Sequence, residues 1–245
     1  MKVGKIILLV MSLFLMACSS DDIPEEKNID FTYEKGTFAD MSLQYRKGIF
    51  SFNTQDKPAL VIYLHGGTSR GDDNEKPLEE AGVDSIRNYL SSKRINAVFL
   101  VPQCPSTEKA WGGEMNQVLK ELIAYYLDSG IADSDKVYIF GGSMGGTGTW
   151  SMLSDYPGLF SAAMPVAGNP AGTNADKLVQ TPVYTVMGTA DKIMGDNVRT
   201  NVFNLIQNLA GHGDEVRIDT EDGWTHEDTC IKSYTTERLD WIFCH

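Results

Sequence analysis

The chain has 245 residues, with 33 acidic and 21 basic side chains and a formal net charge of −12. This acidic balance argues against nucleic acid and against anionic membrane surfaces as partners, because both repel negative charge. The four histidines and four cysteines show no metal-ligand spacing, so the sequence predicts no metal site.

Residues 1–17 have the pattern of a secretion signal. Lys2 and Lys5 precede an apolar run, 6–17, that is too short to span a bilayer. The run ends in Leu15-Met-Ala-Cys18, which resembles the lipobox of bacterial lipoproteins. That resemblance implies cleavage before Cys18 and a lipid on this cysteine. The alternative is an ordinary secretion signal with an incidental cysteine.

The next segment, 18–29, is polar and acidic, and we expect it to be a solvated tether. The remaining residues, 30–245, suit one domain. The sequence therefore predicts an exported protein that touches a bacterial membrane only through the lipid on Cys18. We expect this to be the outer membrane, at its periplasmic face or the cell surface.

Alternating segments at 31–38 and 41–50 predict an antiparallel pair of strands. Short apolar runs then alternate with amphipathic stretches, which predicts an α/β fold with a mostly parallel eight-stranded sheet covered by helices on both faces. The remaining strands are expected at 59–64, 97–102, 137–140, 162–166, 183–187 and 216–218, and helices near 83–93, 116–128, 145–156, 197–209 and 227–243.

A G-x-S-x-G motif, Gly141-Gly-Ser-Met-Gly145, lies between a predicted strand and a predicted helix. This context is typical of a nucleophile elbow, with Ser143 as the nucleophile. Asp191 and His226 follow later strands, so all three reach the carboxyl edge of the sheet, where ligands bind. We expect His226 to be the base and Asp191 to orient it.

Each of these partners has a competitor in the sequence. Asp196 also precedes a predicted helix, although it lies further from the strand end than Asp191. His212 is in a Gly-His-Gly turn that should lie at the opposite edge of the sheet. The sequence therefore favours Asp191 and His226.

Two backbone N–H groups are predicted to form an oxyanion hole. One belongs to Met144, the residue after the nucleophile, and the other to Gly67 in the loop after the third strand. Thr68 remains an alternative to Gly67. We expect His65 to shape this loop by hydrogen bonding.

Three further side chains are expected at the same edge of the sheet, and we predict that Gln103, Trp111 and Trp224 contact the substrate. The aromatic rings would line a pocket for a sugar ring or an aryl acyl group. The alternative is that they pack the bases of their loops.

The exported chain permits a disulfide, and Cys104–Cys230 is the favoured pair. Cys230 and Cys244 are expected at opposite ends of the last helix, too far apart to bond. Free buried thiols are the alternative.

Three segments together resemble the α/β-hydrolase superfamily: Leu64-His-Gly-Gly67, Val101-Pro-Gln-Cys-Pro105 followed by Trp111, and 141–150. The resemblance covers nearly everything after residue 30. It is strongest to the esterase and peptidase-like branch that includes feruloyl and acetyl-xylan esterases and the carboxylesterase/phospholipase group. It implies hydrolysis of a carboxylic ester through an acyl-enzyme, with no metal or organic cofactor.

The segment between Val166 and Val183 is too short for a helical lid domain, so we expect an open cleft. An open cleft suits a small-molecule ester or an acylated glycan as substrate. A serine peptidase with the same triad is the main alternative. A binding lipoprotein without activity would have a broken triad or oxyanion loop, and the motifs argue against it.

Overall fold

The computed structural model describes residues 29–52, 55–173, 175–178, 181–209 and 215–245. The predicted signal and lipidation site at Cys18 lie outside these residues, as does His212. In the part of the chain that is described, none of the helices combines the length and apolar character needed to cross a bilayer.

Eight strands form one sheet in the order β1-β2-β4-β3-β5-β6-β7-β8. The pairs β1–β2 and β2–β4 are antiparallel, and every other neighbouring pair is parallel. This confirms the predicted mostly parallel α/β fold. The strands are β1 (Thr32–Phe38), β2 (Met41–Phe50), β3 (Ala59–Leu64), β4 (Ala97–Gln103), β5 (Val137–Gly142), β6 (Ala162–Val166), β7 (Val183–Gly188) and β8 (Val216–Glu221).

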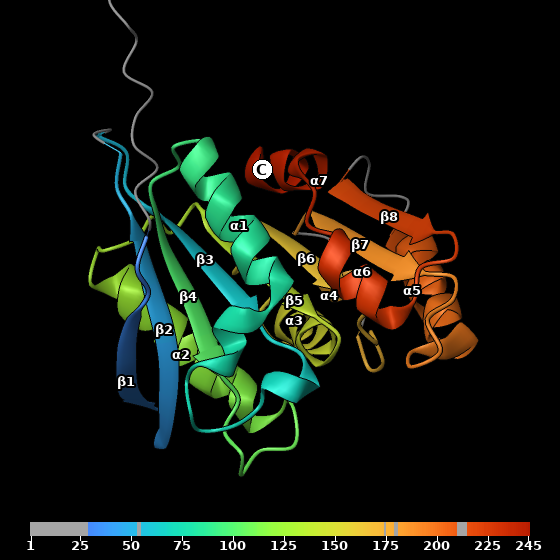
Figure 1. Cartoon of the computed structure of the whole chain (residues 1–245), viewed down its shortest axis with the longest axis horizontal. Coiled ribbons are helices and arrows are strands. Elements are labelled where there is room, and N and C mark those ends of the chain that lie inside the picture. The colour runs from blue at the N-terminus through green and yellow to red at the C-terminus, as the bar shows by residue number, and fades with distance from the viewer. Residues whose placement is uncertain (1–28, 53–54, 174, 179–180, 210–214) are drawn as a thin grey trace, which may run out of the picture.

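Helices cover both faces of the sheet, and Figure 1 shows α1 and α6 in front of it and α2 and α3 behind. The helices are α1 (Ala81–Ser92), α2 (Glu114–Asp128), α3 (Met144–Asp155), α4 (Ala175–Leu178), α5 (Gly195–Leu209), α6 (His226–Lys232) and α7 (Thr236–Phe243). Two short 3₁₀ helices, η1 (Gly67–Ser69) and η2 (Lys76–Glu79), follow β3.

The sheet divides the interior into two hydrophobic clusters. Along β3, every residue is buried and alternate side chains enter opposite clusters. Leu60 and Ile62 join the cluster under α2, α3 and α5, whereas Val61 and Tyr63 join the cluster under α1 and α7. Continuous burial explains why the inner parallel strands β3, β5 and β6 read as unbroken apolar runs.

The last predicted helix, 227–243, is wrong in one respect, because it is two helices. Thr225 and Asp228 form a capping box at the start of α6, and Thr235 caps α7 by accepting a hydrogen bond from the Arg238 N–H. Each cap satisfies N–H groups that have no partner within the helix, so the chain starts a new helix after Tyr234. Cys230 therefore lies in α6, whereas Cys244 directly follows the end of α7.

The predicted Cys104–Cys230 disulfide is also wrong. Cys104 belongs to the cluster under α2 and α3, whereas Cys230 packs against the cluster on the other face of the sheet. All three cysteines in the described residues, Cys104, Cys230 and Cys244, are free thiols.

Candidate active site

Ser143 lies at the turn between β5 and α3 with strained backbone angles, φ 57° and ψ −117°. A residue other than glycine rarely adopts such angles, at a cost of about 1–3 kcal/mol. The turn is tight because α3 starts directly against neighbouring backbone. A Cβ on Gly145 would lie 1.8 Å from Leu64 O, and a Cβ on Gly146 would lie 2.3 Å from Val166 O. Gly145 of the motif and the following Gly146 therefore both let the backbone approach this closely and hold Ser143 in this conformation.

A chain of hydrogen bonds joins Ser143 to His226 and Asp191. The His226 Nε2 is 2.8 Å from Ser143 Oγ, and its Nδ1 is 2.7 Å from Asp191 Oδ2. A carboxylate only accepts, so Nδ1 carries the proton and Nε2 is free to accept from the serine hydroxyl. In this arrangement the imidazole can remove the hydroxyl proton as the oxygen attacks a carbonyl carbon.

The loop after β7 holds the Asp191 carboxylate rigidly. Asp191 is buried, and its Oδ1 accepts hydrogen bonds of 2.9 Å from the N–H groups of both Ile193 and Met194. Arg199 of α5 donates to the backbone oxygens of Asp191 (2.9 Å) and Gly188 (3.2 Å). The carboxylate is thus fixed toward His226 before any substrate arrives.

The competitor Asp196 is not part of this chain. Its side chain is 90% exposed and forms an ion pair with Arg199. The predicted preference for Asp191 as the partner of His226 agrees with this geometry.

The loop 66–69 passes beside Ser143, and its backbone orientation is set by His65. The Gly66 oxygen accepts hydrogen bonds from His65 Nδ1 (2.6 Å) and from the Ser69 N–H (3.2 Å). In a trans peptide the C=O and the following N–H point in opposite directions. The Gly67 N–H therefore points away from His65, and Gly67 is exposed.

His65 can hold this loop only as a neutral imidazole. Its Nε2 accepts from the Cys104 N–H (3.0 Å), so the proton is on Nδ1, which donates to Gly66 O. Burial lowers the pKa of His65 to about 4. The expectation that His65 shapes the loop agrees with these hydrogen bonds.

The N–H of Met144, the first of the two predicted oxyanion donors, is at the first position of α3. N–H groups of a first helical turn have no partner within the helix, and the helix dipole favours negative charge there. A Cβ on Gly67 would lie 4.0 Å from Met144 Sδ, so the two predicted donors come from adjacent segments.

Trp111 and Gln103 do not face a substrate, and the prediction that they do is wrong. Trp111 is only 4% exposed, and its Nε1 donates to His65 O (3.0 Å). Gln103 is 1% exposed, and its amide nitrogen donates to Ser69 O (2.9 Å) and Asp73 Oδ1 (3.0 Å). Both side chains support the 65–74 segment from beneath.

Trp224 is half-buried on the side of the sheet covered by α6 and α7. Its ring centroid lies 5.7 Å from Lys232 Nζ and 5.9 Å from Arg238 Cζ. Its backbone oxygen accepts from the Ala190 N–H (3.0 Å), which ties the His226 loop to the Asp191 loop. A substrate contact by Trp224 stays a prediction.

Three residues that were not predicted from the sequence also support the site, namely Asn74, Glu80 and Arg199. Asn74 is fully buried with a positive φ of 54°, and its N–H donates to Gln103 Oε1 (2.5 Å). Asparagine tolerates such angles, so the Gly71-Asp-Asp-Asn74 stretch was a usable signal for a structured loop. Glu80 and Arg199 belong to no recognisable sequence motif, so their contacts could not be predicted.

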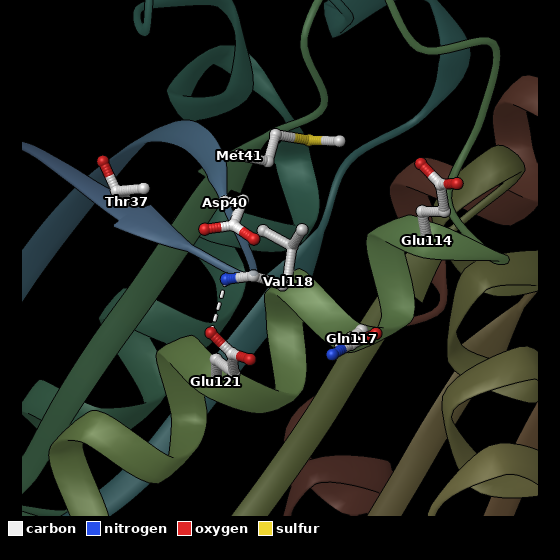
Figure 2. Close-up of a pocket in the computed structure, with 8 residues that line it drawn as sticks. Thr37, Asp40, Met41, Glu114, Gln117, Val118 and Glu121 are labelled. Carbon is white, nitrogen blue, oxygen red and sulfur yellow. Dashed lines mark hydrogen bonds between the residues drawn. The ribbon is translucent and has the colours of Figure 1, made fainter.

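A separate cavity of about 570 Å³ lies between the β1–β2 turn and α2. Figure 2 shows Asp40 and Met41 on one side of it and Glu114, Gln117 and Glu121 of α2 on the other, with Glu121 hydrogen-bonded to the backbone of the turn. Neither Ser143, Asp191 nor His226 lines this cavity. Across the described part of the chain, no three His, Cys, Asp or Glu side chains are grouped so as to hold a metal ion.

Residues 106–189, about a third of the chain, match the model of the prolyl oligopeptidase family. The matched segment includes Ser143 and ends before Asp191.

Curated relatives match about half of the chain. A probable acetylxylan esterase A of Aspergillus fumigatus is 25% identical over 134 residues, which are 49% of this chain and 33% of the relative. Acetylxylan esterase A of Emericella nidulans is 23% identical over 131 residues, or 49% of this chain and 40% of the relative. The chain thus spans less than half the length of either relative.

Solved structures match nearly the whole described domain. A thermostable esterase superposes with a TM-score of 0.74 at 24% identity, over 87% of this chain and 62% of that one. A mutant feruloyl esterase module from Clostridium thermocellum, complexed with sinapinate, gives 0.67 at 13% identity, over 88% of both chains. The chain has the α/β-hydrolase fold, as its sheet order and the strand-to-helix turn at Ser143 also indicate.

Proposed function

We propose that the protein is a serine hydrolase that cleaves carboxylic esters through an acyl-enzyme. The observation that carries this proposal is the hydrogen-bonded chain from Asp191 through His226 to Ser143, with Ser143 on a strained turn. Esterases among the curated relatives and the superposed structures add support.

In the proposed reaction, Ser143 Oγ attacks the ester carbonyl carbon while His226 Nε2 takes the hydroxyl proton. The N–H groups of Gly67 and Met144 stabilise the resulting oxyanion, and His226 then gives its proton to the leaving alcohol. In the second half, His226 removes a proton from water as the water oxygen attacks the acyl carbon, and it then gives this proton to Ser143 Oγ as the acid is released. Asp191 stabilises the imidazolium in both halves.

We infer that the substrate is a short-chain or aryl acyl ester carried on a bulky scaffold such as a plant glycan. Two features support this substrate class. The connection between β6 and β7 is short, and its described residues include only the four-residue helix α4. Acetylxylan esterases also recur among the curated relatives.

The alternative is a serine peptidase, which the match to the prolyl oligopeptidase family favours. Hydrolysis of aryl acetates, acetylated xylan and a peptide amide by the protein from Ser19 onward separates the two. We expect ester turnover and acetate release, with little amide cleavage. Comparable rates on ester and amide would make the peptidase function the better proposal.

Variants test the proposed roles in the same assays. Ser143→Ala and Asp191→Asn should lower kcat by about 10⁴-fold or more, because they remove the nucleophile or the correct imidazole tautomer. Asp196→Asn is the matched control, since Asp196 is exposed and outside the hydrogen-bonded chain. Loss of activity in Asp196→Asn but not in Asp191→Asn would overturn the assignment.

We further propose that the protein is exported and held on a bacterial outer membrane by a lipid on Cys18. The lipobox-like sequence before Cys18 and the acidic segment after it support this proposal. Labelled palmitate should be incorporated into the wild-type protein and not into Cys18→Ser, which should leave the membrane fraction. Equal labelling of both would exclude Cys18 as the lipid site.

A further inference from the structure

The side chain of Glu80 lies behind the loop that supplies the Gly67 N–H. Glu80 is the residue before α1, where a short polar side chain usually caps the helix. Its side chain makes no capping hydrogen bond, and its backbone oxygen accepts from the Val83 N–H instead (2.9 Å). The carboxylate is directed away from α1 and toward residues 66–69.

This carboxylate makes three hydrogen bonds around the loop. Its Oε1 accepts from the Gly66 N–H (2.9 Å) and from Ser69 Oγ (2.6 Å), and its Oε2 accepts from the Tyr63 hydroxyl (3.3 Å). Ser69 and Tyr63 are buried. Hydrogen bonds to an ionised acceptor are stronger than neutral ones, especially where water is excluded.

Glu80 and His65 together hold Gly66 at both of its backbone polar groups. His65 donates to the Gly66 oxygen, whereas Glu80 accepts from the Gly66 N–H. Glycine has the widest backbone freedom of any residue, so an unheld Gly66 would let the following peptide rotate. That peptide carries the Gly67 N–H, the predicted second oxyanion donor.

Gly66 also lies between the carboxylate and the serine. A Cβ on Gly66 would lie 3.4 Å from Glu80 Oε1 and 3.7 Å from Ser143 Cβ. Glu80 therefore lies one residue behind the backbone that borders Ser143, and it reaches the reacting atoms only through that backbone.

We propose that Glu80 is a positioning residue of the oxyanion hole: by clamping Gly66 and Ser69, its carboxylate aims the Gly67 N–H at the developing oxyanion. This inference rests on the proposed esterase function. Loss of one oxyanion donor typically costs 10²–10³-fold in kcat. Loosening the donor by Glu80→Ala should therefore lower kcat by roughly 10- to 100-fold, with KM changed by less than about 3-fold.

The experiment compares wild type with Glu80→Ala, Glu80→Gln and Glu79→Ala on an aryl acetate, at a temperature well below unfolding. Glutamine keeps an oxygen that can accept from Gly66 and Ser69 but lacks the charge, so Glu80→Gln should lose clearly less kcat than Glu80→Ala. Glu79→Ala removes the same charge from the adjacent exposed residue and should behave as wild type. Ser69→Ala removes the hydrogen bond from Ser69 Oγ to Glu80, and it replaces Glu80→Ala in the comparison if that variant does not fold.

Inhibition by phenylboronic acid supplies a readout that general destabilisation would not move. Its tetrahedral adduct with Ser143 places an oxygen in the oxyanion hole, so its inhibition constant should rise in Glu80→Ala by a factor similar to the loss in kcat. Unchanged kcat and boronate affinity in Glu80→Ala and Ser69→Ala would overturn the inference. A Glu80→Gln variant as impaired as Glu80→Ala would also overturn it.

These outcomes differ from a failure of the proposed function. If wild type shows no turnover of aryl acetates, or if Ser143→Ala retains it, the esterase proposal itself is wrong. If wild type is active through Ser143 and Glu80→Ala matches it, the reaction stands and only the role of Glu80 is wrong.

Discussion

His65 connects two loops of the site through one buried imidazole. Its Nε2 accepts from the N–H of Cys104 after β4, and its Nδ1 donates to Gly66 after β3. Trp111 covers it, with ring centroids 5.0 Å apart. Protonation of the ring would turn the acceptor nitrogen into a donor facing the Cys104 N–H, so the loop geometry depends on a neutral His65.

This dependence predicts a loss of stability in mild acid. The pKa of His65 is about 4 in the folded protein, and that of an unperturbed histidine is 6.5. Between these values the unfolded chain binds a proton that the folded chain does not. The free energy of unfolding should therefore fall as pH drops from 6.5 to 4, by up to about 3 kcal/mol from this residue.

Urea unfolding of wild type and His65→Asn at pH 7, 6, 5 and 4 measures this contribution. Asparagine does not titrate, so the free energy of unfolding of the variant should depend less steeply on pH. The difference from wild type is the contribution of His65. His245→Gln, at an exposed position, should keep the wild-type slope. Parallel slopes for wild type and His65→Asn would show that His65 does not titrate in this window.

At the scale of elements, the sequence predicts strands better than it predicts helix ends. The ranges 41–50, 59–64 and 162–166 agree with β2, β3 and β6, because the alternating pattern of the first and the apolar runs of the other two are distinct from their flanking residues. The division of 227–243 into α6 and α7 could not be predicted from periodicity. Apolar residues recur on both sides of the break, and the side chain of Thr235 starts the second helix locally.

The direction in which loop side chains point is the second feature that could not be predicted from the sequence. Ser143, Asp191 and His226 were predicted to lie together because each follows a strand that ends at the same edge of the sheet. In the structure, hydrogen bonds join these three residues. Gln103 and Trp111 also lie at that edge, as predicted from the strand ends. The direction of their side chains, however, could not be predicted from strand positions. Gly148 in α3 indicates the direction of Trp111, since a Cβ on Gly148 would lie 2.4 Å from Trp111 Cβ. A helical glycine thus makes room for an inward-facing tryptophan.

At the scale of the whole molecule, the sheet separates two hydrophobic clusters, and a side chain in one cluster does not reach the other. Cys104 is on the α2 and α3 side, and Cys230 is on the α1 and α7 side. Burial raises the pKa of Cys104 to about 11 and that of Cys230 to about 12. Each thiol therefore stays protonated at neutral pH, with no bonding partner across the sheet.

This separation predicts how many thiols react in the protein from Ser19 onward. At pH 8 the native protein should react quickly at one thiol, the exposed Cys244, and at three after unfolding in guanidinium. Cys244→Ser should remove the fast reaction and leave two thiols in guanidinium. A single reactive thiol in unfolded wild type, with a Cys104–Cys230 peptide found by mass spectrometry, would mean that the two cysteines meet. The loop after β4 and helix α6 would then have to approach each other around the carboxyl edge of the sheet, and the placement of Cys104 and Cys230 on opposite faces would be wrong.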